Sequence, residues 1–324
     1  HADRRYSSHE LIERLPGRFR DHYTARVADE FFFFDERIQI TPSAEYQRYI
    51  NRFSSEENDR LNEGEDADRA FTDFTNYRLG ALVVPWRDRK RQFFLKGSAY
   101  SGKRMPLFIE LFGEAGAIIG NTDLLPESSE TVEGGVGLEW KGGSWSGQVE
   151  LNAFRRVVED LILFVPNSQF TLRPENVDRA DIRGGEFSSR VRAFDHLKAY
   201  FNYTYQRAIN RSDVSFLRGR FLALRPLHEL HAGLALHNDR IEGGAEAIYV
   251  GAVYKDRTNE PQNFQAPRWI YNAYFRFAIS GTIEGEERLL LGVDLKNVLD
   301  DRISDIVNYP LPGRSLYVSL TYRF

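Results

Sequence analysis

The chain has 324 residues, 43 Lys and Arg against 47 Asp and Glu, a formal net charge of −4, and no cysteine. This charge balance argues against nucleic-acid binding, for which a clustered basic excess is typical, and the lack of cysteine excludes disulfides and thiolate metal sites. No apolar run approaches the roughly 18 residues that a transmembrane helix needs. A β-barrel is compatible with the composition, because only alternate residues of its strands face lipid.

The first 19 residues are charged and show no clean period, so residues 1–19 are predicted to form an exposed loop. The sequence starts at His1 without an early apolar segment, which indicates a mature form, a fragment or a processed product. From about residue 21 the pattern alternates, and residues 21–34 and 38–47 are predicted to form a hairpin. The acidic segment 54–73 is predicted to be a solvated loop.

The rest of the chain repeats this pattern, with alternating apolar and polar residues separated in turn by short and long connections. The long connections include residues 102–129, 155–178 and 207–228. Together with the first hairpin, the pattern predicts about thirteen strands. The further predicted strands are residues 77–84, 92–100, 131–140, 145–154, 180–192, 197–206, 229–236, 245–254, 269–278, 289–296 and 315–324.

The last strand has the clearest pattern. Leu316, Val318, Leu320, Tyr322 and Phe324 alternate with polar residues and end the sequence on an aromatic side chain. This is typical of a transmembrane barrel strand, which has one face toward lipid, one toward a watery lumen, and aromatic residues at the membrane boundary.

The connections also predict an orientation. In outer-membrane barrels the short turns are periplasmic and the long loops extracellular, so a last strand that ends in the periplasm places residues 1–19 in an extracellular loop. An odd number of strands does not fit a complete bacterial barrel. The chain is therefore predicted to contribute about thirteen strands to a larger barrel. Two alternatives stay open: a passive pore of about fourteen strands complete in one chain, and a soluble all-β binding domain.

The long segment 102–140 contains an ordered set of motif residues. It resembles the corresponding loop of TonB-dependent outer-membrane receptors, and further similar stretches are residues 180–186, 217–226 and 296–324. The resemblance runs from about residue 21 to the end and assigns structural motif roles to Gly120, Asn121, Leu124, Pro126, Glu127 and Phe324. The matching residues of the segment are Arg104, Pro106, Glu110, Leu111, Phe112, Gly120, Asn121, Leu124, Pro126, Glu127, Glu133 and Gly135.

The resemblance implies an all-β, transmembrane antiparallel barrel of 22 strands with a plugged lumen, in the bacterial outer membrane. It implies that residues 20–324 are the C-terminal portion of that barrel. The plug, the segment that contacts TonB and about nine strands would then belong to another chain or segment, because an open sheet edge is costly in hydrocarbon. The expected partners are outer-membrane lipid, that plug-bearing portion and, through the plug, TonB.

No arrangement of residues indicates an enzyme active site. His228 and His231 lie near each other in the sequence, but no metal site and no covalently bound cofactor is predicted. The glycine pairs at 134–135, 184–185 and 243–244 are interpreted as bulges or close backbone approaches.

In the receptor family the ligand lies above the plug, between extracellular loops and upper strands. Mixed cations and aromatics there would suit an anionic, aromatic iron chelate such as a ferric siderophore. Haem receptors of this family usually carry a histidine between the two loop motifs, and no histidine lies between Arg104 and Glu127, so the resemblance disfavours haem. The candidate ligand-binding residues are Arg104, Phe112, Phe154, Arg155, Arg156, Arg218 and Arg220.

Overall fold

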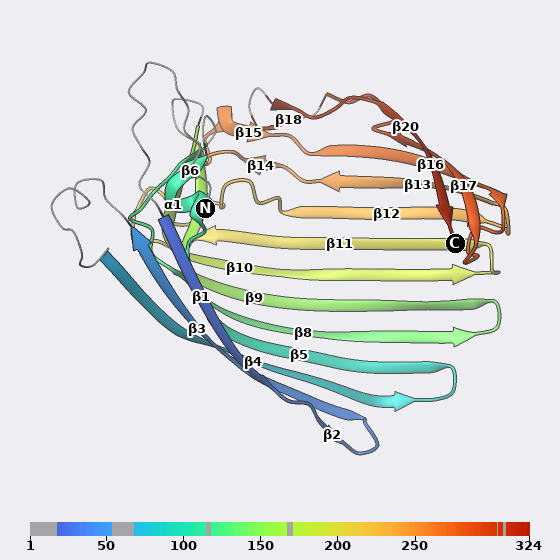
Figure 1. The fold of residues 1–324 in the computed structure, drawn as a ribbon, viewed down its shortest axis with the longest axis horizontal. Helices are drawn as coiled ribbons and strands as arrows, with labels where there is room; N and C mark the ends of the chain where they lie inside the picture. Colours follow the sequence, from blue (N-terminus) through green and yellow to red (C-terminus); the bar gives the residue numbers. More distant parts are fainter. Residues whose placement is uncertain (1–17, 54–67, 115–117, 167–170, 303, 307–308) are drawn as a thin grey trace.

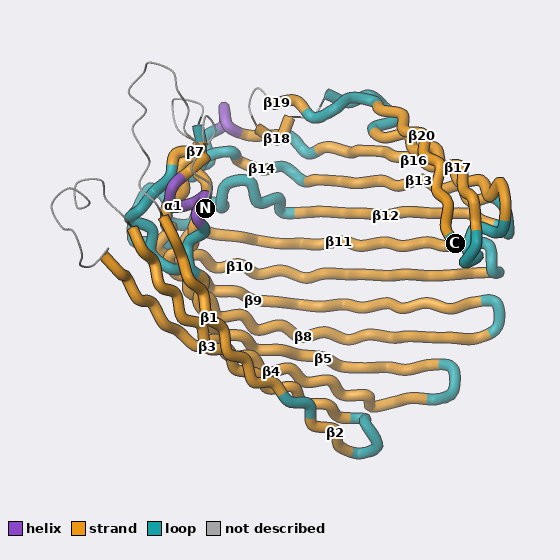
Figure 2. Tube along the Cα trace, in the orientation of Figure 1, coloured by secondary structure: helices purple, strands orange, loops and turns teal. Residues whose placement is uncertain are grey.

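The structure, a computed structural model, describes residues 18–53, 68–114, 118–166, 171–302, 304–306 and 309–324. Most of this part of the chain forms one antiparallel sheet, in which consecutive long strands are neighbours (Figure 1). Short turns join the strands at one end of the sheet, here called the turn end. The longer connections and the short helix α1 (Phe108–Phe112) gather at the opposite, loop end (Figure 2).

The order of neighbouring strands follows the sequence from β1 to β20, with small elements inserted between the long strands. The long strands are β1 (Arg18–Ala28), β3 (Ile38–Phe53), β4 (Asp68–Arg87), β5 (Arg91–Arg104), β8 (Glu127–Gly142), β9 (Trp145–Pro166), β10 (Leu172–Ala193), β11 (Leu197–Asn210), β12 (His228–His237), β13 (Ile241–Val250), β16 (Arg268–Ser280), β17 (Arg288–Lys296) and β20 (Ser315–Arg323). The small elements are β2 (Phe31–Phe33), β6 (Gly113–Glu114), β7 (Ile118–Ile119), β14 (Val253–Tyr254), η1 (Pro261–Asn263), β15 (Phe264–Gln265), β18 (Ser304–Ile306) and β19 (Tyr309–Pro310).

Each predicted strand has a counterpart in this order, and the all-β, antiparallel class is confirmed. Several predicted loops are wrong in part, because strands extend into them. Most of residues 155–178 belongs to β9 and β10, which pair as far as Leu172 and Pro166, and residues 68–73 belong to β4. The upper part of β9 has adjacent apolar residues, such as Val157 with Val158 and Leu161 with Ile162, whereas the ends of β10 and β4 are mostly polar. All three therefore lack the strict alternation that reveals a strand with one apolar face. Of the predicted loop 1–19, residues 18 and 19 lie in β1 and the others lie outside the described residues.

The register separates the two faces of the sheet. On β17 and β20, Val293 pairs with Val318 and Leu291 with Leu320, which places these apolar side chains on one face. The opposite face carries polar residues, such as Asp294, whose carboxylate accepts a hydrogen bond from Arg276 at 2.8 Å. We call the apolar face the outer face and the polar face the inner face. This alternation is that of a barrel wall between lipid and a wet lumen.

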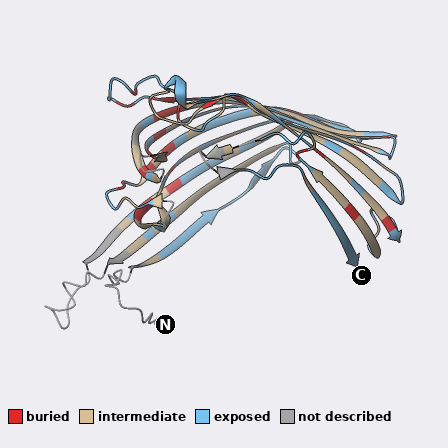
Figure 3. Ribbon diagram, turned by 90° about the horizontal axis from the view of Figure 1, so that it is seen from above, coloured by how far each residue is buried: buried red, intermediate tan, exposed pale blue. Residues whose placement is uncertain are grey.

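The sheet is curved but open. Figure 3 shows an arched wall, and among the described residues β1 and β20 are the two ends of the strand order and do not pair with each other. The described strands therefore do not form the complete fourteen-stranded pore that the sequence left open. No helix in the described part of the chain is long and apolar enough to cross a membrane.

Several glycines make room for aromatic rings on the inner face. The position of a Cβ atom on Gly184 would lie 2.6 Å from the Phe154 ring, and that on Gly244 would lie 2.6 Å from the Tyr274 ring. The pairing runs without a register shift through the three glycine pairs noted in the sequence. The interpretation as close approaches is thus confirmed at Gly184 and Gly244, and the interpretation as bulges is wrong. A ring that leans across the neighbouring strand needs space, but it does not require an extra residue in that strand.

Candidate functional site

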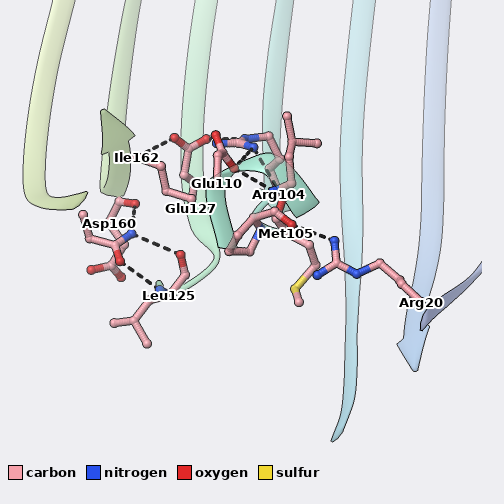
Figure 4. A network of polar contacts seen from close by, with 11 residues as sticks. Arg20, Arg104, Met105, Glu110, Leu125, Glu127, Asp160 and Ile162 are labelled. Atoms are coloured by element: carbon pink, nitrogen blue, oxygen red, sulfur yellow. Dashed lines mark hydrogen bonds and ion pairs between the residues drawn. The ribbon is translucent and has the colours of Figure 1, made fainter. Parts of the chain in front are cut away.

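The connection between β5 and β8 is fastened to the loop end of the sheet by an ion-pair network (Figure 4). Arg104, the last residue of β5, donates to Glu127 Oε2 through Nε at 2.7 Å and to both carboxylate oxygens of Glu110 at 3.0 and 3.2 Å. Glu127 Oε1 accepts the Ile162 backbone N–H at 2.7 Å. The network therefore links β5, α1, β8 and β9.

The network is buried unevenly. Glu110 and Glu127 are 4% and 6% exposed, whereas the Arg104 side chain keeps contact with solvent. Burial lowers the pKa of Arg104, but the hydrogen bonds from its guanidinium to Glu127 and Glu110 outweigh this and raise its pKa above the ordinary value. Burying two carboxylates requires such a partner. Glu110 also accepts the Leu107 N–H at 2.6 Å, which closes the first turn of α1.

The other motif residues of this connection hold it against β9 and β10. The Asn121 side chain donates to the Pro174 carbonyl at 3.0 Å, and its backbone N–H donates to the Glu110 backbone carbonyl at 2.9 Å. Leu124 packs with Leu111 and Ile162 in a small buried cluster. A Cβ atom on Gly120 would overlap the backbone of Phe112, so this position requires a glycine.

Pro126 is half buried directly before Glu127, and its neighbour Leu125 is held at both backbone groups by the Asn176 side chain. Phe324 is 95% exposed beside Tyr322, with the ring centroids 5.9 Å apart. This position suits an aromatic residue at a membrane boundary.

The structure separates the seven candidate ligand residues. Arg104 is engaged by two carboxylates, and Phe112 packs against the buried cluster of Leu111, Leu124 and Ile162. Arg218 donates to Asp213 at 2.5 Å and Arg220 to the Phe216 carbonyl at 3.4 Å, so both are bound within their own loop.

Adjacent residues of β9 point to opposite faces, which divides the last three candidates. Phe154 and Arg156 lie on the inner face and line the same cavity, whereas Arg155 lies on the outer face with Asp181 and Arg183. Only Phe154 and Arg156 of the seven are therefore brought together on the polar side of the wall.

The inner-face cavity has a volume of about 600 Å³ and extends over β3, β4, β5, β8, β9, β10 and β11. Arg225 also lines it, although no sequence pattern indicated this residue. The connection after β11 folds back along that strand, with Leu222 N–H donating to the Ala208 carbonyl and Gln206 N–H to the Leu227 carbonyl. This backbone pairing carries Arg225 over the wall. Arg156 also lines a second cavity of about 360 Å³ beside Arg104.

The cavity lining has three cations, Lys96, Arg156 and Arg225, and two carboxylates, Glu133 and Glu186, and these charges are not all paired with one another. Lys96 pairs with Glu150, and Glu133 accepts a hydrogen bond from Ser98 at 2.7 Å. Within the described part of the chain, Arg156 and Arg225 make no ion pair or side-chain hydrogen bond. They are therefore free to bind an anion, and Phe154 adds an aromatic surface beside them.

The two histidines that lie near each other in the sequence do not meet. The phenolic OH of Tyr203 is 2.7 Å from His228 Nδ1 on the outer face, and that of Tyr200 is 3.1 Å from His231 Nε2 on the inner face. The described residues hold no group of three or more His, Cys, Asp or Glu placed to bind a metal ion.

An apolar outer face, a polar inner face with a lined cavity, and a fastened loop end define the wall of a transmembrane β-barrel. Residues 13–298 match the family described as TonB dependent receptor-like, beta-barrel. The chain belongs to this family of transport receptors, which is found in the bacterial outer membrane. The comparison with curated proteins gave no match.

Solved structures of such receptors share the fold. The chain is 17% identical to the copper transporter OprC, with a TM-score of 0.70 over 95% of this chain and 48% of that one. It is 15% identical to the siderophore receptor PiuA from Acinetobacter baumannii, with a TM-score of 0.66 over 95% and 44%. It is 14% identical to the FrpB iron transporter from Neisseria meningitidis, with a TM-score of 0.64 over 97% of this chain and 47% of that one. The chain thus spans less than half the length of each of these proteins.

Proposed function

We propose that this chain is the C-terminal portion of the barrel of an outer-membrane receptor that takes up an anionic iron chelate of the siderophore type by TonB-dependent active transport. The observation that carries this proposal is the inner-face cavity, where Arg156 and Arg225 lie beside Phe154 without a carboxylate partner in the described residues. The chelate is the transported ligand and not a resident cofactor. Family membership and the siderophore receptor among the similar structures are consistent with this assignment.

The chemistry of the cavity suits such a chelate. Guanidinium groups bind carboxylate and catecholate oxygens through charge-assisted hydrogen bonds, each with a net value of about 1.5–3 kcal/mol. An aromatic ligand ring can stack on Phe154 or against a guanidinium plane. A solute that enters through the lumen reaches Phe154, Arg156 and Arg225, because all three line the cavity on the inner face.

The open edges of the sheet support a proposal about partners. Strands β1 and β20 each lack a second neighbour in the sheet of described residues. Unpaired strand edges cannot face hydrocarbon, so we expect another chain or segment to supply the remaining strands and a plug. TonB would act through that plug. The division into a loop at 1–19 and a barrel portion at 20–324 stays a prediction.

The test is ligand binding by the assembled receptor, including the plug and all strands. The double variant Arg156→Gln with Arg225→Gln removes the two cavity arginines, and Arg89→Gln with Arg240→Gln removes two charges from turns at the other end. The probe is a ferric tris-catecholate labelled with radioactive iron, and a neutral ferric hydroxamate serves for comparison.

We expect the cavity variant to bind the catecholate at least tenfold more weakly, from the loss of two charge-assisted contacts, and the turn variant to bind it like the unchanged receptor. Equal catecholate binding by both variants would contradict the proposed site. Failure of the unchanged receptor to bind or take up either chelate would contradict the proposed ligand class.

A further inference from the structure

Three arginines form a row across the outer face of the sheet. Arg183 of β10 lies directly opposite Arg155 of β9 on one side and Arg207 of β11 on the other. The row shares its face with apolar residues further down the same strands, including Leu151 and Phe201. It therefore lies on the side that faces lipid and not on the side of the cavity.

The position of the row along the strands places it at the edge of the membrane. Arg155 follows Trp145 by ten residues, and Trp145 packs against Phe194 at the turn end, with ring centroids 5.0 Å apart. Ten residues at about 3.3 Å each, tilted by about 40°, rise about 25 Å. This matches the height of the apolar band of a bacterial barrel, roughly 25 Å. If the Trp145 ring marks the periplasmic boundary, the row lies at the outer-leaflet headgroups.

Aromatic residues support this depth. Tyr205 is 39% exposed on the same face, beside Arg207 in β11. Further along the wall, Trp269 stacks on Tyr271, with ring centroids 5.9 Å apart, and both side chains are exposed on the outer face. Exposed Tyr and Trp on the lipid-facing side are typical of a membrane–water boundary.

The row has more positive charge than its surroundings compensate. Asp181 binds Arg183 at 2.7 Å and Arg155 at 3.4 Å, so one carboxylate serves two guanidinium groups. Arg207 makes no side-chain hydrogen bond or ion pair within the described residues. Beyond Asp181 on the same face, Arg179 lies opposite Glu159, and this pair has no net charge. The row with Asp181 thus has a net charge of +2, and Glu130 of β8, which lies opposite Val157 on the same face, reduces the net charge of this region to +1.

Like charges placed directly opposite each other destabilise a sheet unless an anion lies between them. Guanidinium groups bind phosphate oxygens in a bidentate way, and phosphate-bearing headgroups are the anions available at this depth. We propose that Arg155, Arg183 and Arg207 bind the phosphate of an outer-leaflet lipid, with Asp181 holding the first two in place. This inference rests on the proposed position of the chain in an outer membrane.

The experiment compares two double variants of the complete receptor in detergent. Arg183→Gln with Arg207→Gln leaves Arg155 paired with Asp181, and the control Arg190→Gln with Arg192→Gln removes two inner-face charges near the turn end. The probes are lipid A with two phosphates, the same lipid after dephosphorylation, and inorganic phosphate. Native mass spectrometry reports bound lipid, and heat-modifiable migration on a gel reports folding. A second outer variant, Arg183→Lys with Arg207→Lys, keeps the charges but loses the planar groups.

We expect the unchanged receptor and the inner-face control to bind the phosphorylated lipid at least tenfold more tightly than the dephosphorylated one. The outer Gln variant should lose this preference, and the Lys variant should keep only part of it. The inference is overturned if the folded Gln variant keeps the full preference, or if inorganic phosphate displaces the lipid at equal concentration, since the site would then bind free phosphate. Membrane fractionation separates the two proposals: a receptor absent from the outer membrane contradicts the proposed function, whereas a failed lipid preference leaves its location unchanged.

Discussion

Replacing Glu127 by Gln should release the connection between β5 and β8 without unfolding the sheet. The carboxylate is 6% exposed and accepts two hydrogen bonds at 2.7 Å, from Arg104 Nε and from the Ile162 N–H. A glutamine can still accept the bond from Ile162, but its NH₂ group then faces the guanidinium of Arg104, donor against donor. The variant therefore loses one charge-assisted hydrogen bond, worth about 1.5–3 kcal/mol.

Since about 1.4 kcal/mol corresponds to a tenfold change in an equilibrium constant, this loss increases opening of the connection by roughly 10- to 150-fold. Hydrogen exchange measured by mass spectrometry on peptides covering residues 105–112 should rise accordingly, while peptides of β16 and β17 stay protected. Glu130→Gln is the matched control, because Glu130 lies on the same strand, is exposed, and makes no side-chain hydrogen bond in the described structure. Equal exchange in the two variants would refute this account.

Arg104→Gln tests the same network from its other side. It leaves the buried carboxylates of Glu110 and Glu127 without a cation, which costs about 3–5 kcal/mol in a fully buried site. We expect the lower part of that range, because the Arg104 side chain is 40% exposed. The double variant with Glu127→Gln should lose less folding free energy than the sum of the losses in the two single variants. An additive result would show that the two residues act independently.

Three further predictions concern the wall. Gly184→Ala places a Cβ atom against the β11 backbone and the ring that covers this glycine, and should lower the temperature of heat-modifiable unfolding; Gly134→Ala, whose Cβ would lie 3.8 Å from the nearest atom, should not. Val318→Arg puts a charge on the outer face near the bilayer centre and should cost about 2–4 kcal/mol of folding free energy in lipid, whereas Ser319→Arg on the inner face should cost much less. The Lys198 hydrogen bond lowers the pKa of Glu284 in the turn after β16. Its stabilisation is complete above the ordinary value of 4.5 and is lost as the pH falls through the lowered pKa, so Glu284→Gln should lower the unfolding temperature at pH 7, and by progressively less as the pH falls below 4.5.

The sequence alone determined the strands that cross the apolar band. Alternation is a local property with a period of two residues, so Leu316, Val318 and Leu320 define an apolar face whatever their neighbours are. The same rule assigns Arg155 and Arg156 to opposite faces once β9 is known to continue past residue 154. That continuation was missed because the upper part of β9 has adjacent apolar residues, such as Val157 and Val158, and the upper part of β10 is mostly polar, so neither alternates.

The tertiary structure decided which cations are free. Arg104 is separated in sequence from Glu110 and Glu127 by a connection whose course depends on long-range contacts with β9 and β10, so its neutralisation could not be read from spacing. Arg225 reaches the cavity only because its loop pairs back along β11. The outer row of arginines likewise requires the register of three strands, which is set by hydrogen bonds between them and not by the composition of any one.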